Sequence, residues 1–428
     1  MKHLLFALLA AGSVAACTDD GAPVPASVAE VGAIEVFTNY RGDTATAFRA
    51  VLDRFEESTG FEVLHVGTAD LAFRIQERID ESDPPDIALL PQPGLIRELA
   101  NEGAAMAVET VSPLLRELVA DNFDDLVPTV SVDGQVYGVP WRVDVSSLIW
   151  YRPDVFEEWQ YTVPESMDQL QELVGRMESD GFAPWCIGIE SFEATGWVGT
   201  DWVEDLVIRQ QGLDYYDRWA AGDVSFDDPG VRRAFTTWDE IALSPGLHFG
   251  TTRTILNTPW AQAADPMLEP APGCLLHRQT GSWSQELPDG LLIGEDVDLF
   301  PVPPGEEGAV DPIILNGEFA TALTSRPGVA ELMSFLLDID SGAIWAQQGG
   351  YVSPHPDFDP ANYTNDFDRR LHDFIQSADA VRFDGSDTMP PSVGTGSFWE
   401  GIVQYVGTRD LDLAVAVIDF GARDPGDE

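Results

Sequence analysis

The feature that most constrains this sequence is an alternation of strand and helix patterns that begins at residue 33. The run 33-AIEVFT-38 is apolar enough for a buried strand, and the amphipathic helix after it stops at Gly60. The pattern repeats with strands at 61–66 and 86–90, each followed by a helical pattern. Such a βαβαβα succession requires a parallel sheet joined by right-handed crossovers. The chain is therefore predicted to be an α/β protein.

The pattern changes after the third strand–helix unit. A hairpin turn at Asp133-Gly134 precedes one long extended segment, 136–156. Helical patterns then dominate from 166 to 260 and return at 328–348, 366–378 and 398–420, with strands expected at 185–189, 274–278, 297–302 and 318–323. A barrel of eight strand–helix units would need far more repeats than the chain shows, so the pattern counts against this architecture.

The N-terminus has the composition of an export signal. Lys2 and His3 give a short positive region, and the apolar run 4–16 is too short to span a bilayer. The signal peptide is predicted to be residues 1–16, and its end, 14-VAAC-17, resembles a lipobox in which Cys17 becomes the lipid-modified N-terminus. An ordinary signal peptide is the alternative. Residues 17–32 have the small, polar composition of a tether, so we expect an exported protein held by lipid on the outer face of the cytoplasmic membrane.

Cysteine use agrees with export. With Cys17 carrying lipid, Cys186 and Cys274 are an even pair in an oxidising compartment, which predicts a disulfide between them. Two buried free thiols are the alternative. The cysteines fit neither metal-ligand spacing nor a Cys-x-x-Cys redox motif, and the histidines never fall at helical metal-site spacing. The sequence gives no reason to expect a metal or a cofactor.

The net charge of −50 limits the partners of the chain. A surface this acidic repels nucleic acid and anionic lipid, so neither is expected to bind, and contact with the membrane is expected only through the N-terminal lipid. The acidic residues are spread along the chain and 44% of residues are hydrophobic, which indicates a folded protein and not an acidic tail.

The stretch 182–202 raises the question of catalysis or binding. It gathers three tryptophans and three carboxylates, namely Trp185, Trp197, Trp202, Glu190, Glu193 and Asp201. A glycoside hydrolase needs two carboxylates about 5–9.5 Å apart, but close pairs arise by chance among 73 acidic residues. The chain has no G-x-S-x-G elbow, P-loop or H-E-x-x-H motif. Binding is therefore favoured, while a hydrolase stays open, as does a binder of a betaine-like cation held in an aromatic cage.

Stretches spread over residues 33–428 share the motifs of one family: 54-RFEESTGFEV-63, 82-SDPPDIALLPQPG-94, 138-GVPWRVDVSSLIWYRPDVF-156, 185-WCIGIES-191, 195-TGWVGTDWVED-205, 273-GCLLHRQ-279, 349-GGYVSPH-355 and 389-MPPSVGTGSFWEGIVQYV-406. Together they resemble the sugar-binding lipoproteins of ABC importers related to maltose-binding protein, and most closely those for α-glucosides, including their two cysteines.

The resemblance implies a non-enzymatic protein of two α/β lobes, the type II periplasmic-binding-protein fold. Lobe 1 would hold residues 33–143 and 314–350, and lobe 2 residues 145–312 and 352–428. Ligand would bind in the cleft between the lobes and favour their closure about a hinge, which the permease of the transporter then recognises. The implied ligand is an α-glucoside or oligosaccharide, and the implied state is a monomer.

The resemblance and the positions of residues at strand ends indicate which side chains contact the sugar. The candidates are Asp43, Gln92, Trp141, Arg142, Asp144, Glu190, Trp197, Asp201, Arg278, Glu318 and Trp399. Carboxylates accept hydrogen bonds from hydroxyl groups, an arginine donates a fork of them, and an indole packs on the C–H face of a sugar ring. Helix capping is an open alternative for Asp43 and Asp201, and packing between helices is one for Trp399.

Overall fold

The strands of the chain form two larger sheets and one short hairpin in a computed structural model, which describes residues 32–123, 126–306 and 308–422. The predicted signal peptide (1–16), Cys17 and the tether up to residue 31 lie outside the described residues. The hairpin joins β4 (Ser131–Val132) to β5 (Gln135–Val136). Asp133 and Gly134 both have positive φ, 50° and 79°, which is the geometry expected of the predicted turn.

The first sheet has six strands in the order β12-β11-β3-β1-β2, with β6 also paired to β11. Its strands are β1 (Ile34–Thr38), β2 (Val63–Gly67), β3 (Ile87–Leu90), β6 (Val139–Val145), β11 (Pro312–Ala322) and β12 (Ala380–Phe383). β1 runs parallel to β2 and to β3, which confirms the parallel sheet expected from the alternating pattern. β11 runs antiparallel to β3 and to β6.

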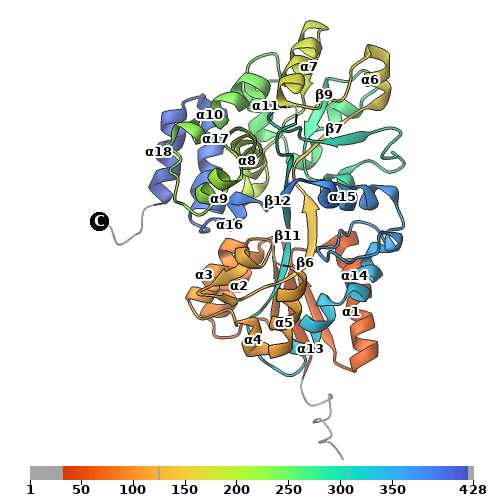
Figure 1. Cartoon of the computed structure of the whole chain (residues 1–428), viewed down its shortest axis with the longest axis vertical. Helices are drawn as coiled ribbons and strands as arrows, with labels where there is room; N and C mark the ends of the chain where they lie inside the picture. Colours follow the sequence, from red (N-terminus) through yellow and green to blue (C-terminus); the bar gives the residue numbers. More distant parts are fainter. Residues whose placement is uncertain (1–31, 124–125, 307, 423–428) are drawn as a thin grey trace, which may run out of the picture. The chain divides into compact units, whose positions relative to one another are not determined.

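Helices cover both faces of the first sheet (Figure 1). They are α1 (Gly42–Thr59), α2 (Leu71–Asp80), α3 (Pro93–Asn101), α4 (Val108–Val111), α5 (Pro113–Asn122), α13 (Val329–Leu337) and α14 (Ile339–Ala346), with a 3₁₀ turn at Val127–Val130. α1 packs beside α14 on one side, while α2 and α3 lie on the other. Gly60 ends α1 in the left-handed conformation with φ 78°, as predicted, because glycine adopts positive φ without a steric penalty.

The second sheet has four strands in the order β10-β7-β9-β8. They are β7 (Leu148–Tyr151), β8 (Ala183–Trp185), β9 (Cys274–Arg278) and β10 (Asp298–Pro301). The helices near it are α6 (Pro153–Trp159), α7 (Met167–Ser179), α8 (Trp197–Gln211), α9 (Leu213–Ala220), α10 (Pro229–Trp238), α11 (Thr252–Asn257), α12 (Asp265–Leu268), α15 (Asp366–Ser377), α16 (Gly385–Thr388), α17 (Phe398–Thr408) and α18 (Leu411–Gly421). Shorter turns are Asp239–Leu243 and Val393–Ser397 (π) and Phe192–Ala194, Trp260–Gln262, Gly281–Glu286 and Pro360–Asn362 (3₁₀).

The chain crosses between the two sheets at neighbouring places. β6 leads into β7 through Ser146 and Ser147, and β11 pairs with β12 at its start and with β3 at its end. A third segment, around Val352, lies beside β6. The Val143 amide of β6 donates a hydrogen bond to the Val352 carbonyl at 3.0 Å. Figure 1 shows β6 and β11 running side by side through the middle of the described chain. These crossing strands position the polar residues described below.

Some predicted elements differ from the structure. The segment 136–156, expected to be continuous, divides into β5, β6 and β7, and it becomes helical at Pro153, which occupies the first position of α6. The strand expected at 185–189 is β8 and ends at Trp185. β12 was not expected, because its four residues, 380-AVRF-383, carry no distinct apolar period.

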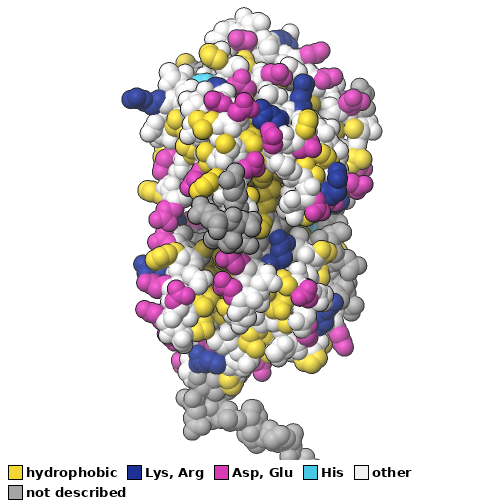
Figure 2. Space-filling view, turned by 90° about the vertical axis from the view of Figure 1, so that its left-hand side faces the viewer, with side chains coloured by type: hydrophobic (Ala, Val, Ile, Leu, Met, Phe, Trp, Pro, Cys, Tyr) yellow, Lys and Arg dark blue, Asp and Glu magenta, His cyan; other side chains and the backbone are white. Residues whose placement is uncertain are grey.

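The surface reflects the acidic composition of the chain. Figure 2 shows Asp and Glu side chains spread over one face, with fewer Lys and Arg among them and apolar side chains between. Like charges distributed in this way repel one another across this face. No helix in the described part of the chain is long and apolar enough to cross a membrane.

Candidate functional site

A polar cavity of about 910 Å³ lies beside the crossing strands, which is within the size range of small-molecule sites. The start of α1, the turn Gly281–Glu286, the segment after α14 and the start of α15 enclose it. A smaller cavity of about 20 Å³ shares part of this lining and lies against β6. The polar side chains on the two cavities belong to Arg41, Asp43, Thr44, Thr46, Arg142, Asp144, Ser282, Ser284, Gln285, Glu286, Gln348, Asn365, Asp366 and Asp368.

Asp43 borders the larger cavity from the first turn of α1. The start of this helix is closed by Thr44, whose hydroxyl donates to the Arg41 carbonyl at 2.7 Å and accepts from the Arg41 amide at 3.2 Å. Thr44 therefore takes the capping role that was the alternative for Asp43. The exposed Asp43 carboxylate is near the positive end of the α1 dipole, which favours its negative charge. The charged carboxylate can accept hydrogen bonds from hydroxyl groups.

Arg142 and Glu318 form an ion pair between the crossing strands β6 and β11. Nε and Nη2 of Arg142 each donate to a carboxylate oxygen of Glu318 at 3.1 Å. Nη1 donates to the Gly350 carbonyl at 3.0 Å, and the guanidinium lies over the Trp345 ring at 5.3 Å. A bidentate pair on two antiparallel strands fixes the plane of the guanidinium, so Arg142 borders the smaller cavity in one orientation.

Asp144 is two residues further along β6 and borders the same cavity. Its carboxylate accepts from the Val145 amide at 2.8 Å and from the Ser282 amide at 2.7 Å. Burial raises the pKa of Asp144, while the nearby Arg142 charge and the Ser282 hydrogen bond oppose the shift. The carboxylate thus links the crossing strand to the turn that follows β9.

Trp141 departs from its expected position. Its ring is 0% exposed and contacts the rings of Phe48, Trp345 and Tyr351 in the core. The register explains this placement, because Arg142 pairs with Glu318 and Pro140 with Phe319, so that Trp141 is the extra residue of a bulge. The structure places the ring in the core and not on the cavity.

Arg278, Asp201 and Gln92 are engaged by protein groups. Arg278 is 2% exposed and donates to Asp205 from Nε at 3.0 Å and from Nη2 at 2.6 Å, and to Asp201 from Nη1 at 2.5 Å. Burial raises the pKa of Asp201 to about 8, although the Arg278 charge opposes the shift. Gln92 hydrogen-bonds the Asp387 carboxylate. The structure therefore joins β9 to α8 through a buried ion pair where the sequence predicted free sugar contacts.

A second group of predicted residues is aromatic. Trp197 begins α8 and its ring meets the Trp260 ring edge-on, with centroids 5.4 Å apart. The Trp260 amide donates to the Glu190 carbonyl at 3.0 Å, which holds Glu190 beside this pair. Gly196 allows the backbone of Trp399 to approach, because a Cβ at this position would lie 2.5 Å from the Trp399 carbonyl oxygen. Glu190 and Trp197, from one stretch, thus lie near Trp260 and near the backbone of Trp399, which come from distant stretches.

Sequence reasoning missed Trp260, Phe192 and Asp368. The available signal for Trp260 was a tryptophan outside any helical apolar period, directly after Pro259. Phe192 is 91% exposed with φ 52°, and its amide donates to Glu190 Oε1 at 2.9 Å. A large aromatic side chain exposed on a left-handed residue is uncommon and directs attention to this loop. No sequence pattern distinguished Asp368 among its acidic neighbours.

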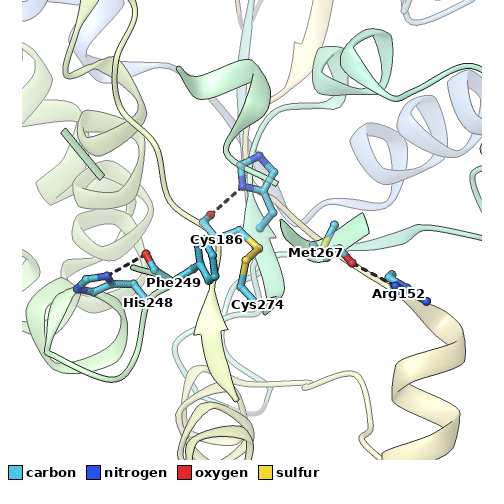
Figure 3. The surroundings of a disulfide bond; sticks show 7 residues. Arg152, Cys186, His248, Phe249, Met267 and Cys274 are labelled. Carbon is cyan, nitrogen blue, oxygen red and sulfur yellow. Dashed lines mark hydrogen bonds between the residues drawn. A yellow bond between two sulfur atoms is a disulfide. The ribbon is translucent and has the colours of Figure 1, made fainter. Parts of the chain in front are cut away.

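The predicted disulfide between Cys186 and Cys274 is present, with an S–S distance of 2.09 Å (Figure 3). It joins the residue after β8 to the first residue of β9, and His277 Nδ1 is 2.9 Å from the Cys186 carbonyl oxygen. The bond anchors the start of the loop that carries Glu190 and Trp197. Within residues 32–123, 126–306 and 308–422, no group of three or more His, Cys, Asp or Glu side chains is arranged to hold a metal ion.

A family model described as a bacterial extracellular solute-binding protein matches residues 41–336. The chain is 36% identical to the osmoprotective compounds-binding protein GgtB of Synechocystis sp., over 86% of this chain and 87% of that protein. It is 33% identical to the alpha-glucosides-binding periplasmic protein AglE of Rhizobium meliloti, over 90% of this chain and 86% of that protein. Among solved structures, the bacterial solute receptor AcbH has a TM-score of 0.74 at 19% identity, covering 91% of this chain and 97% of its own. This likeness confirms the predicted fold class of two α/β lobes joined by crossing strands.

Proposed function

Because the chain belongs to the family of bacterial extracellular solute-binding proteins, we propose that it captures a carbohydrate for an ABC importer. The favoured ligand is an α-glucoside or oligosaccharide, the class that the name of AglE gives for that relative. One observation carries the proposal: the cavity of about 910 Å³ beside the crossing strands, whose lining is rich in hydroxyl, amide and carboxylate groups. Such groups suit a neutral molecule with many hydroxyls.

The proposed ligand contacts form two groups. The polar group on the cavities is Asp43, Arg142 and Asp144, with Glu318 orienting Arg142. The aromatic group is Trp197, Trp260 and Trp399, with Glu190 beside them and Phe192 on the adjoining loop. Acids for the hydroxyls and indoles for the C–H faces together match the two kinds of surface on a sugar ring.

Closure of two lobes is the proposed mechanism. The proposed lobes are residues 33–143 with 314–350 and residues 145–312 with 352–428. The crossing of β6, β11 and the segment at Val352 beside one another supports a hinge there. A ligand that contacts both lobes favours the closed state by its differential affinity, and the permease subunits would recognise that state.

The remaining proposals concern location and assembly. We expect export, removal of residues 1–16, lipid attachment at Cys17 and action as a monomer without catalysis. Replacing Cys17 with Ala should release the protein from membrane fractions, and unchanged retention there would contradict lipidation. A chromogenic α-glucoside that the purified protein hydrolyses would contradict the non-enzymatic role.

A second ligand class has a specific observation in its favour, because the relative GgtB is named for binding osmoprotective compounds. A thermal-shift series with maltose, trehalose, sucrose, glucosylglycerol and betaine separates the candidates. A ligand at 100 times its dissociation constant should stabilise the protein by about 2.7 kcal/mol. Stabilisation by the sugars supports the main proposal, whereas stabilisation by betaine alone would overturn it.

A further inference from the structure

We propose that Asp368 is a positioning residue, which fixes the bend at Gly349 and Gly350 and, through it, the guanidinium of Arg142. Asp368 borders both cavities from the first turn of α15 and is only 2% exposed. Its expected effect on affinity rests on the proposed function. The hydrogen bonds it makes can be tested without any ligand.

The first step is the hold of Asp368 on the bend. Its Oδ2 accepts from the Gly350 amide and from Asn365 Nδ2, both at 2.8 Å. Gly349 and Gly350 have φ of 86° and 80°, a conformation that other residues rarely adopt. A Cβ on Gly349 would also lie 3.1 Å from Asn365 Nδ2, so a larger residue would be crowded there. Because both residues of the bend are glycines, the bend has no side chain with which to pack. The buried carboxylate therefore holds the Gly350 amide, in addition to the contacts of the bend with Ala346 and Arg142.

The second step leads from the bend to the crossing strands. The Gly350 carbonyl accepts from Arg142 Nη1 at 3.0 Å, and Arg142 pairs with Glu318 through its other two nitrogens. Hydrogen bonds therefore run without a break from α15 through residue 350 to β6 and β11. In a buried chain of this kind each bond polarises the next, so loss of one end weakens the others.

The third step concerns the cavity. A guanidinium carries five N–H donors, and the contacts to Glu318 and Gly350 engage one on each nitrogen. The remaining donors on Nη1 and Nη2 are available where Arg142 borders the smaller cavity. The direction of these two N–H groups depends on the position of Nη1, which the hydrogen bond to the Gly350 carbonyl fixes. Asp368 therefore controls how Arg142 is presented to a solute hydroxyl.

The test compares Asp368→Asn with a matched control, Asp373→Asn. Both acids are on α15, but Asp373 is exposed and borders neither cavity. Amide hydrogen exchange is measured at Gly350, and affinity is measured for each of the five solutes above that stabilises the wild type. We expect Asp368→Asn to speed Gly350 exchange and to weaken affinity, each by about tenfold or more, because a hydrogen bond to a charged acceptor is lost. Asp373→Asn should change neither.

Three outcomes overturn the proposal. Unchanged Gly350 exchange means that Asp368 does not hold the bend, and faster exchange with unchanged affinity means a purely structural role. Weaker affinity with unchanged exchange means that Asp368 contacts the solute directly. If no solute binds the wild type, the carbohydrate proposal fails and Gly350 exchange alone decides whether Asp368 holds the bend. Should Asp368→Asn not fold, Asp368→Glu, which keeps the charge but moves the carboxylate, carries the same measurements and expectations.

Discussion

Among single residues, Trp399 has the most testable role. It is half-buried in the first turn of α17, and none of the described residues accepts a hydrogen bond from its Nε1. Trp399→Ala should cost roughly 2–4 kcal/mol of sugar affinity, as the loss of a central aromatic contact does, and leave the ligand-free melting temperature nearly unchanged. Calorimetric titration and thermal unfolding measure the two effects.

The matched control for Trp399 is Trp238, whose ring is 0% exposed in the core of the second sheet. Trp238→Ala should lower the melting temperature sharply, because emptying a tryptophan-sized space costs about 3–5 kcal/mol. An early-melting Trp399→Ala protein with intact affinity would assign Trp399 to the core instead.

Arg278 shows how a residue expected at the ligand can serve the fold. Its guanidinium is buried between Asp201 and Asp205. Arg278→Ala should lower the free energy of unfolding by about 3–5 kcal/mol, because it leaves buried carboxylates without their cation. Urea unfolding measures this cost, with Arg54→Ala as the control, since Arg54 pairs with Glu57 on the surface. If Arg278→Ala kept full stability but lost much of its affinity, Arg278 would instead be a ligand contact.

At the level of elements, the sequence predicted what apolar periodicity determines. The β1–β3 units, the stop of α1 at Gly60 and the turn at Asp133-Gly134 follow from local pattern and local chemistry. The bulge that buries Trp141 arises from the register between β6 and β11, strands that are far apart in the sequence. β12 is recognisable only from its pairing with β11, for the same reason.

In the candidate site, too, the residues placed by local pattern could be predicted, and those placed by tertiary contacts could not. The start of α1 brings Asp43 to the larger cavity, and the alternation of side chains along β6 brings Arg142 and Asp144 to the smaller one. Trp260 and Asp368 belong to short turns and a helix start whose placement depends on tertiary contacts. Local periodicity does not report such contacts; it leaves Trp260 as a tryptophan outside any apolar period and does not distinguish Asp368.

The disulfide is expected to stabilise the protein and to hold the loop between β8 and α8 in place. It closes a separation of 88 residues, which in the chain-entropy model stabilises by about 4–5 kcal/mol. The double variant Cys186→Ala/Cys274→Ala should lose most of this stability and also bind sugar more weakly, because the loop carries Glu190 and Trp197. Denaturant unfolding and titration of the same preparation measure both effects. Unchanged affinity in a destabilised protein would show that the bond serves the fold alone.

For the whole molecule, the buried carboxyl groups around α8 predict a dependence of stability on pH. Asp201 is close to Glu204 and to Asp387, and all three are close to Asp384. Arg278 pairs with Asp201, whereas Tyr216 and backbone amides donate to Glu204 and Gln92 hydrogen-bonds Asp387. Burial first, and neighbouring acids second, raise the pKa of all three groups, and the pKa of Asp201 reaches about 8 although the Arg278 charge opposes the shift. Each group therefore binds its proton more tightly in the folded state than in the unfolded chain.

A folded-state pKa above the unfolded value means that stability is lost as the pH rises through the folded pKa. The melting temperature should consequently fall between pH 7 and pH 9 at constant ionic strength, a window above the unfolded pKa of histidine, about 6.5. Asp387→Asn should flatten this fall, because the variant has one carboxyl fewer to ionise, whereas Asp223→Asn on the surface should not. A melting temperature that stays level or rises over this window would mean that the acids around α8 are already ionised at pH 7, held so by Arg278 and by backbone amides such as Gly385, which donates to Glu204 at 2.6 Å.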